Sequence, residues 1–219
     1  MRTTDPASPG RADVLPDACS DLMWRSGHGA FVAGPDTGPA PAGVPAGAVT
    51  LGVRFLPGAG GPALGLPLAE LRDLRVDAGE LWPELAAQLA PDLTAREALS
   101  KLVVVAHTLA ADRPPDRAVQ SAARRLSDPR SRVEPLADDL GLSERQLRRR
   151  FHATVGYGPK TLQRVLRFRR LLAGIDGSSG SPDFARLAFD AGYADQAHMT
   201  RDCGRLAGLS PSALARSRA

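Results

Sequence analysis

The stretch Leu136–Ser143, which reads LADDLGLS, and the stretch Leu187–Asp195, which reads LAFDAGYAD, decide the fold that we predict. In each stretch an alanine follows a leucine, a glycine comes four residues after the alanine, and an apolar residue follows the glycine. The small alanine lets two helices cross closely, and glycine readily adopts the turn conformation between them. The repeated spacing predicts two helix-turn-helix units in the second half of the chain.

Helix-capping signals follow both turns. Ser143 with Gln146 three residues later is the pattern of a capping box, and Asp195 is a good N-cap for the helix after the second turn. A second capping box, Thr94 with Glu97, predicts a helix that begins after residue 93. A capped helix after each turn is held away from the body of the domain, where it can enter a major groove of DNA.

The chain divides at the linker Arg113-Pro114-Pro115, because consecutive prolines stop a helix and stiffen the chain. Residues 1–13 are expected to be disordered. Short apolar runs separated by glycine and proline predict strands near 22–24, 30–33 and 49–56, with a long loop over 35–47. The expected fold class is α+β, with a small β-rich N-terminal domain over 14–112 and an all-α double helix-turn-helix domain over 113–219.

Helical periodicity predicts which side chains face the cores. In the helix after residue 93 the expected inward positions are Leu99, Leu102, Val103, Ala106 and Leu109. A later helix is predicted from Pro159 to about Gly174, and Gly177–Ser181 is read as a flexible interruption. Ser181-Pro182 is then the expected N-cap and first residue of the next helix, and Ser210-Pro211 starts the last one.

The distribution of charge separates the two halves. Residues 1–112 hold 8 Lys and Arg against 13 Asp and Glu, a net charge of −5, whereas residues 113–219 hold 20 against 11, a net charge of +9. A basic half joined to an acidic half indicates that the basic half meets a polyanion. Double-stranded DNA is the partner that fits the helix-turn-helix pattern.

Composition argues against several other classes. The longest apolar run, Leu102–Ala106, is too short to span a bilayer, the N-terminus lacks a signal-peptide pattern, and the two cysteines form no disulfide framework, so we expect a cytoplasmic protein without membrane contact. The scattered histidines predict no metal, and we expect no cofactor and no enzymatic activity. The stretch Gly58–Ala63 loosely imitates a dinucleotide-binding loop, but Pro62 interrupts it, so we expect a turn that opens no helix.

The second half of the sequence resembles the AraC/XylS family of transcription regulators. The resemblance covers residues 116–217 and is carried by Leu136–Phe151, Gly156 with Pro159, Gly192–Arg201 and Gly208–Leu214. It implies two helix-turn-helix units joined by a long helix, and a sequence-specific regulator that reads two successive major grooves.

The sequence departs from the family pattern in three places. Cys203 and Leu214 stand where the family usually has aromatic residues, and Gly177–Ser181 looks like an insertion before the second unit. The small thiol of Cys203 is expected to weaken the packing beneath the second recognition helix. The second unit is therefore expected to be less rigid than the first.

Six residues are the expected DNA contacts. Leu147 and Phe151 face inward in the first recognition helix, which turns the neighbouring arginines outward, and Met199 takes the inward position in the second. The resemblance implies base contacts at exposed positions, and arginine suits guanine whereas glutamine suits adenine. The candidates are Arg145, Arg148, Arg149, Gln196, His198 and Arg201. Their alternative role is a solvated basic face or phosphate contacts, and we expect Arg150 to be structural or to contact the backbone.

Two other functions stay open at this stage. Cys19 could serve as the methyl acceptor of a DNA alkyl-transfer protein, although a zinc-thiolate cluster that would activate it is absent from the sequence. The chain could also be an interaction protein whose module binds DNA without sequence preference. For the N-terminal half, a small-molecule effector, a contact with RNA polymerase and the oligomeric state are open, and Arg54 is either a ligand for an anionic effector or part of an intradomain ion pair.

Overall fold

The computed structural model describes residues 13–178, 180 and 182–218. The strands are β1 Asp13–Val14, β2 Ser20–Arg25, β3 Gly29–Ala33, β4 Ala40–Pro41, β5 Thr50–Phe55 and β6 Arg75–Asp77. The helices that follow or separate them in the N-terminal part are α1 Gly60–Leu64, the 3-10 helix η1 Leu68–Glu70, α2 Ala78–Leu81, α3 Pro83–Ala87 and α4 Ala95–Ala110. The C-terminal part holds α5 Arg117–Leu126, α6 Leu136–Asp139, α7 Glu144–Val155, α8 Pro159–Asp176, α9 Phe184–Ala191, α10 Gln196–Ala207 and α11 Pro211–Arg216.

The N-terminal part is a small antiparallel sheet covered on one face by α4. The strand order is β5-β2-β3-β6, and β1 pairs with β4 in a separate two-stranded ribbon. Side chains of β2 alternate, so that Leu22 and Trp24 enter the core while Met23 lies on the other face. The Trp24 indole N–H donates to the carbonyl of Ala90 at 3.0 Å, which satisfies its one polar atom in a fully buried site. The predicted β-rich N-terminal domain is confirmed.

Helix α4 forms where the capping box predicts it, but it is rotated relative to the expected face. Thr94 accepts a hydrogen bond from the Glu97 amide, and the Glu97 carboxylate accepts from the Thr94 amide. Leu99 and Val103, which were expected to face inward, are 48% and 53% exposed. Leu102, Ala106 and Leu109 are buried as expected, and Ala98 and Val105 complete the buried stripe. This helix has apolar residues on adjacent faces, so periodicity alone misplaces the edge of the stripe.

The expectation that no helix opens in Gly58–Ala63 was wrong. Helix α1 begins at Gly60, and Pro62 lies in its first turn, where the missing proline N–H needs no partner. The glycines allow a close approach to α7, because a Cβ on Gly61 would lie 2.2 Å from the carbonyl oxygen of Ala153. The glycine-rich stretch therefore serves packing between the two halves of the chain.

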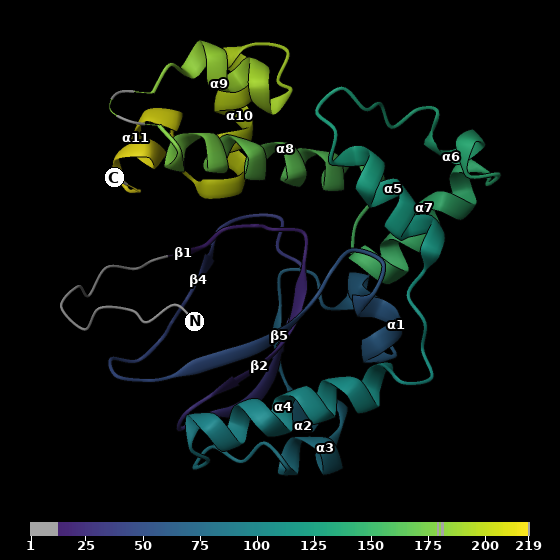
Figure 1. Cartoon of the computed structure of the whole chain (residues 1–219), viewed down its shortest axis with the longest axis vertical. Coiled ribbons are helices and arrows are strands. Elements are labelled where there is room, and N and C mark those ends of the chain that lie inside the picture. Colours follow the sequence, from purple (N-terminus) through teal and green to yellow (C-terminus); the bar gives the residue numbers. More distant parts are fainter. Residues whose placement is uncertain (1–12, 179, 181, 219) are drawn as a thin grey trace.

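Helices α5 to α11 form the predicted all-α arrangement. In Figure 1, α5, α6 and α7 gather at one end of the long helix α8, and α9, α10 and α11 gather at its other end. One continuous apolar cluster runs through both groups, with Phe151, Phe168 and Leu206 almost fully buried. Ala18, from the segment before β2, belongs to this same cluster. The N-terminal segment and the C-terminal helices are thus packed together.

The first strand and the N-cap of α9 differ from what the sequence predicted. Asp13 was expected to be disordered, but it pairs with Pro41 in the ribbon of β1 and β4. Strand β4, which contains Pro41, lies inside the stretch 35–47 that was expected to be a loop. The prediction for residues 1–12 and the N-cap at Ser181 lie outside the described residues. Helix α9 is capped by Asp183, whose carboxylate accepts from the amides of Ala185 and Arg186. Aspartate and serine are comparable N-caps, so the sequence did not rank them.

Candidate nucleic-acid interface

The two repeated stretches fold into the same turn. Gly141 and Gly192 both adopt left-handed backbone conformations, with φ of 65° and 87°. After each glycine, the amide of Leu142 or Tyr193 donates to the carbonyl of the alanine five residues earlier, at 2.9 Å in both cases. These are the hydrogen bonds of a Schellman-type helix end, and they fix the angle at which the next helix leaves. Helix α7 after the first turn and helix α10 after the second are therefore equivalent elements.

Helix α7 presents a row of free arginines. Leu147 and Phe151 are buried, as predicted, and the capping box of Ser143 with Gln146 forms. Arg145, Arg148 and Arg149 are exposed, and no ion pair or hydrogen bond of their guanidinium groups is found within the described part of the chain. Positions 145, 148, 149 and 152 share one helix face because they are spaced by three or four residues.

Arg150 differs from its three neighbours. Its guanidinium lies 3.3 Å from the carboxylate of Asp116, which is also the N-cap of α5. Asp116 accepts from the amides of Ala118 and Val119 at the same time. Arg150 therefore ties the first recognition helix to the start of α5, which agrees with the structural role expected for it.

The second recognition helix, α10, divides its candidate residues into two kinds. Gln196 and Arg201 are exposed, and Met199 is buried beneath them. His198 is only 32% exposed, and its ring packs edge-on against Tyr193 with ring centroids 5.2 Å apart. The structure thus brings Gln196 and Arg201 to the surface and holds His198 partly inside.

A polar cluster beneath α10 explains the position of His198. The buried carboxylate of Asp202 pairs with Arg164 of α8 at 3.2 Å, and its other oxygen lies 3.7 Å from Nε2 of His198. Arg167 of α8 lies 3.4 Å from the same nitrogen, and its guanidinium stands 5.4 Å from the centroid of the Tyr193 ring. Sequence reasoning missed this connection between α8 and α10, because partners 31 and 38 residues apart leave no local pattern.

Arg170 makes a further connection from α8. Its guanidinium donates to the carbonyls of Ala191, at the end of α9, and Ser127, at the end of α5. Cations near the last carbonyls of a helix satisfy orphan acceptors and complement the helix dipole. Burial, followed by the nearby Arg167, lowers the pKa of Arg170. Helix α8 therefore fixes both units through charged side chains as well as through its apolar face.

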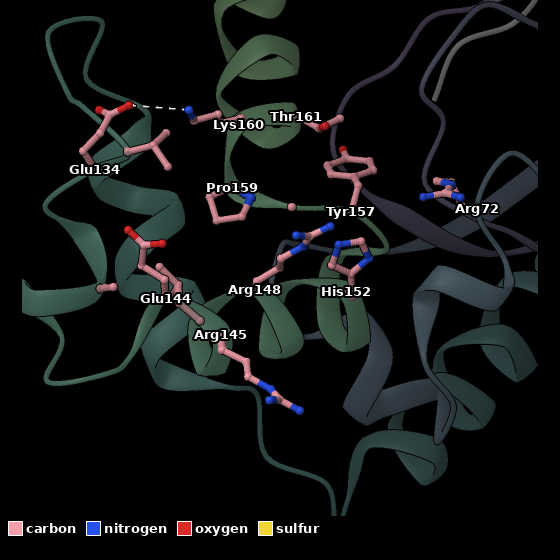
Figure 2. Close-up of a pocket in the computed structure, with 14 residues that line it drawn as sticks. Arg72, Glu134, Glu144, Arg145, Arg148, His152, Tyr157, Pro159, Lys160 and Thr161 are labelled. Carbon is pink, nitrogen blue, oxygen red and sulfur yellow. Dashed lines mark ion pairs between the residues drawn. The ribbon is translucent and has the colours of Figure 1, made fainter.

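A hollow of about 730 Å³ lies beside the first recognition helix. It is lined by Arg145, Arg148 and His152 of α7, by the start of α8, by residues before and within α6, and by Arg72 of the N-terminal part. Figure 2 shows Arg148 beside His152, with Arg72 beyond Tyr157 on the right and Glu134 and Glu144 on the left. Glu134 is paired with Lys160 at 3.7 Å. Two arginines of the exposed row on α7, Arg145 and Arg148, therefore line this hollow.

Neither Cys19 nor Arg54 has the environment of a reactive or ligand-binding group. Burial, with the negative charge of Asp17, raises the pKa of the Cys19 thiol to about 12, so the nucleophilic thiolate is disfavoured. Arg54 is half exposed and pairs with Asp17 at 2.8 Å and Asp21 at 2.9 Å. These contacts favour the intradomain ion pair over an anionic effector at Arg54, and they do not favour alkyl transfer at Cys19.

Comparison with known protein families gives a separate match for each half of the chain. A family model described as a helix-turn-helix domain matches residues 136–217, the segment that contains both turns and both recognition helices. Residues 136–217 are thus an AraC-type helix-turn-helix domain, the DNA-binding part of a transcription regulator. Residues 1–77 of this regulator match a domain of unknown function, DUF6597. No curated protein matches the chain in sequence.

One solved structure has a similar fold over most of the chain. ToxT from Vibrio cholerae is 9% identical, with 93% of each chain covered and a TM-score of 0.50. Two further ToxT structures, one of an apo variant from strain SCE256 and one from strain O395, are each 10% identical with a TM-score of 0.48; they cover 94% and 93% of this chain and 92% of theirs. No helix in the described part of the chain is long and apolar enough to cross a membrane.

Proposed function

We propose that the regulator binds a specific DNA sequence by placing α7 and α10 in two successive major grooves. The observation that supports this most is the pair of equivalent glycine turns at opposite ends of α8, each followed by a capped helix. Helix α8 has 18 residues and is therefore about 27 Å long. Successive major grooves are about 34 Å apart, which the helix plus the breadth of both units can span if the DNA bends slightly.

Base reading in the first groove is assigned to Arg145, Arg148 and Arg149. An arginine that is exposed and without an internal partner is free to donate two hydrogen bonds to O6 and N7 of guanine. Such a pair discriminates against the wrong base by about 1–3 kcal/mol. Arg150 is left out because its guanidinium is engaged with Asp116.

In the second groove we assign contacts to Gln196, Arg201 and His198. Glutamine suits adenine, and arginine suits guanine or a phosphate. His198 is expected to contribute less than the other two, because its Nε2 is turned toward Arg167 and Asp202. The first unit is expected to dominate affinity, since its contact residues are exposed without comparable internal contacts.

The division of labour between the halves is also part of this proposal. Residues 113–219 are assigned to DNA binding, and residues 14–112 to regulation or partner binding. The net charges of +9 and −5 support that division. A small-molecule effector and RNA polymerase are the partners that we propose to test for the N-terminal half.

The experiment is to select a binding site from random DNA and measure the affinity of Arg148→Ala and Arg149→Ala in the full chain. Each variant is expected to lose specific affinity and to relax its preference at one base position. Arg96→Ala is the matched control, because Arg96 is an exposed arginine on α4. This variant should keep the affinity and the base preference of the unchanged chain. If both variants lose affinity equally on all sequences and lower the salt slope by about one, the arginines contact only phosphates and the base-reading assignment fails.

A further inference from the structure

Arg72 belongs to the acidic N-terminal half but lies beside the first recognition helix. It sits in the turn between η1 and β6, and its side chain lines the same hollow as Arg148 and His152 (Figure 2). It is exposed, and within the described residues its guanidinium has no ion pair. By contrast, Arg25, Arg54 and Arg75 of the same half are held by internal hydrogen bonds or ion pairs. Arg72 is thus free to bind something outside the chain.

The turn that carries Arg72 follows η1, which packs closely against α7. Gly156, the C-cap of α7, comes so close to η1 that a Cβ there would lie 3.0 Å from the carbonyl oxygen of Leu68. The next residue after Arg72, Asp73, has a φ of 61°, a conformation that non-glycine residues rarely adopt. Asp73 is held there by hydrogen bonds from the amide and hydroxyl of Thr37, at 2.6 and 2.8 Å. These contacts hold the backbone of the turn, and with it the start of the Arg72 side chain, beside the end of α7.

The charges around Arg72 form a positive site. Burial lowers the pKa of His152, and the positive charges of Arg148 and Arg72 lower it further. The acidic residues of the hollow lie on its other side, and one of them, Glu134, is already paired with Lys160. Like charges held together without a counterion cost free energy, which an incoming anion relieves.

The place of Arg72 along α7 indicates which kind of anion it binds. In helix-turn-helix proteins the N-terminal residues of the recognition helix contact base edges. Arg72 lines the same hollow as His152, in the C-terminal half of α7. In the homeodomain, the C-terminal end of the recognition helix contacts the DNA backbone. We propose that Arg72 contacts a backbone phosphate of DNA bound by α7, so that the N-terminal half forms part of the DNA-binding surface. This inference rests on the proposed function of α7.

The test compares Arg72→Ala with the unchanged full chain on a selected duplex and on random duplex DNA over a range of salt concentrations. Affinity for both duplexes is expected to fall by a similar factor, about three- to fivefold, as for the loss of one exposed ion pair. The salt slope should fall by about 0.9, the value for one phosphate contact. Arg72→Lys should recover most of the loss, because lysine also binds phosphate as a point charge.

Arg96→Ala is the control, because Arg96 is an exposed arginine of the same acidic half on α4. The proposal is overturned if Arg72→Ala behaves like this control while Arg148→Ala still loses binding. It is also overturned if Arg72→Ala tightens binding or changes the preferred base. If neither Arg72→Ala nor Arg148→Ala has an effect, the proposed function of α7 has failed as well.

Discussion

At the scale of single residues, the pKa of His152 is sensitive to the positive charge next to the recognition helix. Its ring is half-buried and lines the same hollow as Arg148 and Arg72. Burial is the largest cause of its lowered pKa, and the charges of Arg148 and Arg72 act in the same direction. A neutral ring is therefore favoured in the folded protein more than in the unfolded chain.

This lowered pKa predicts how stability depends on pH. Because the folded state resists protonation of His152, its contribution is fully present above the unfolded pKa of about 6.5 and is lost as the pH falls toward the lower folded value. The wild-type protein is expected to unfold at a lower urea concentration as the pH falls below about 6.5. In His152→Gln this decrease in the urea midpoint should be smaller. His107→Gln, on the exposed side of α4, is the control. An unchanged profile for His152→Gln would contradict the linkage.

Residue-level prediction succeeded where the chemistry is local. The caps at Thr94, Ser143 and Asp195 depend on side chains reaching amides within three residues, and all three form. The position of His198 depended on Asp202, which is close in sequence, but also on Arg167 and Tyr193 from other elements. Only the three-dimensional packing reveals that this histidine is partly enclosed.

At the scale of elements, two helices carry the same capping box in different settings. In α4 the box of Thr94 with Glu97 starts a helix that covers the sheet, and in α7 the box of Ser143 with Gln146 starts the recognition helix. In each box the N3 side chain accepts a hydrogen bond from the amide of the N-cap residue. The local chemistry is equivalent, whereas the surfaces that the helices present differ.

Removing the two caps separates stability from function. Thr94→Ala and Ser143→Ala should each lower the free energy of unfolding by about 1 kcal/mol, the usual cost of a lost N-cap. Only Ser143→Ala should also weaken DNA binding, because it frays the first turn of the recognition helix that holds Arg145. Urea titration and DNA titration of both variants check this. Equal DNA affinities for the two variants would contradict the assignment of α7.

The elements that sequence reasoning misjudged share one cause. Helix α1 and the rotation of α4 depend on which surface lies opposite: α1 packs against α7, and α4 turns Ala98 rather than Leu99 toward the sheet. Periodicity and propensity describe one element at a time, so they do not choose between two apolar faces or recognise a short buried helix. The long helix α8 was predicted well because Pro159 marks its start and its apolar stripe is unambiguous.

At the scale of the whole molecule, α8 sets the distance between the two recognition helices. Its apolar face runs through the shared core, and Arg164, Arg167 and Arg170 reach out to the second unit. The repeated turn and the charge asymmetry were enough to predict this plan from the sequence. The packing of η1 and α1 against α7 was not predictable, because it joins residues more than 80 positions apart through backbone contacts at glycines.

The most direct test of the account is a hydroxyl-radical footprint of the full chain, verified as a monomer by sedimentation, on a selected duplex. We predict two protected segments about one helical turn, 10 base pairs, apart on one face of the DNA. The double substitution Gln196→Ala with Arg201→Ala should remove the segment under α10 and leave the segment under α7. Protection of a single segment that this double substitution does not change would contradict the claim that both recognition helices engage DNA.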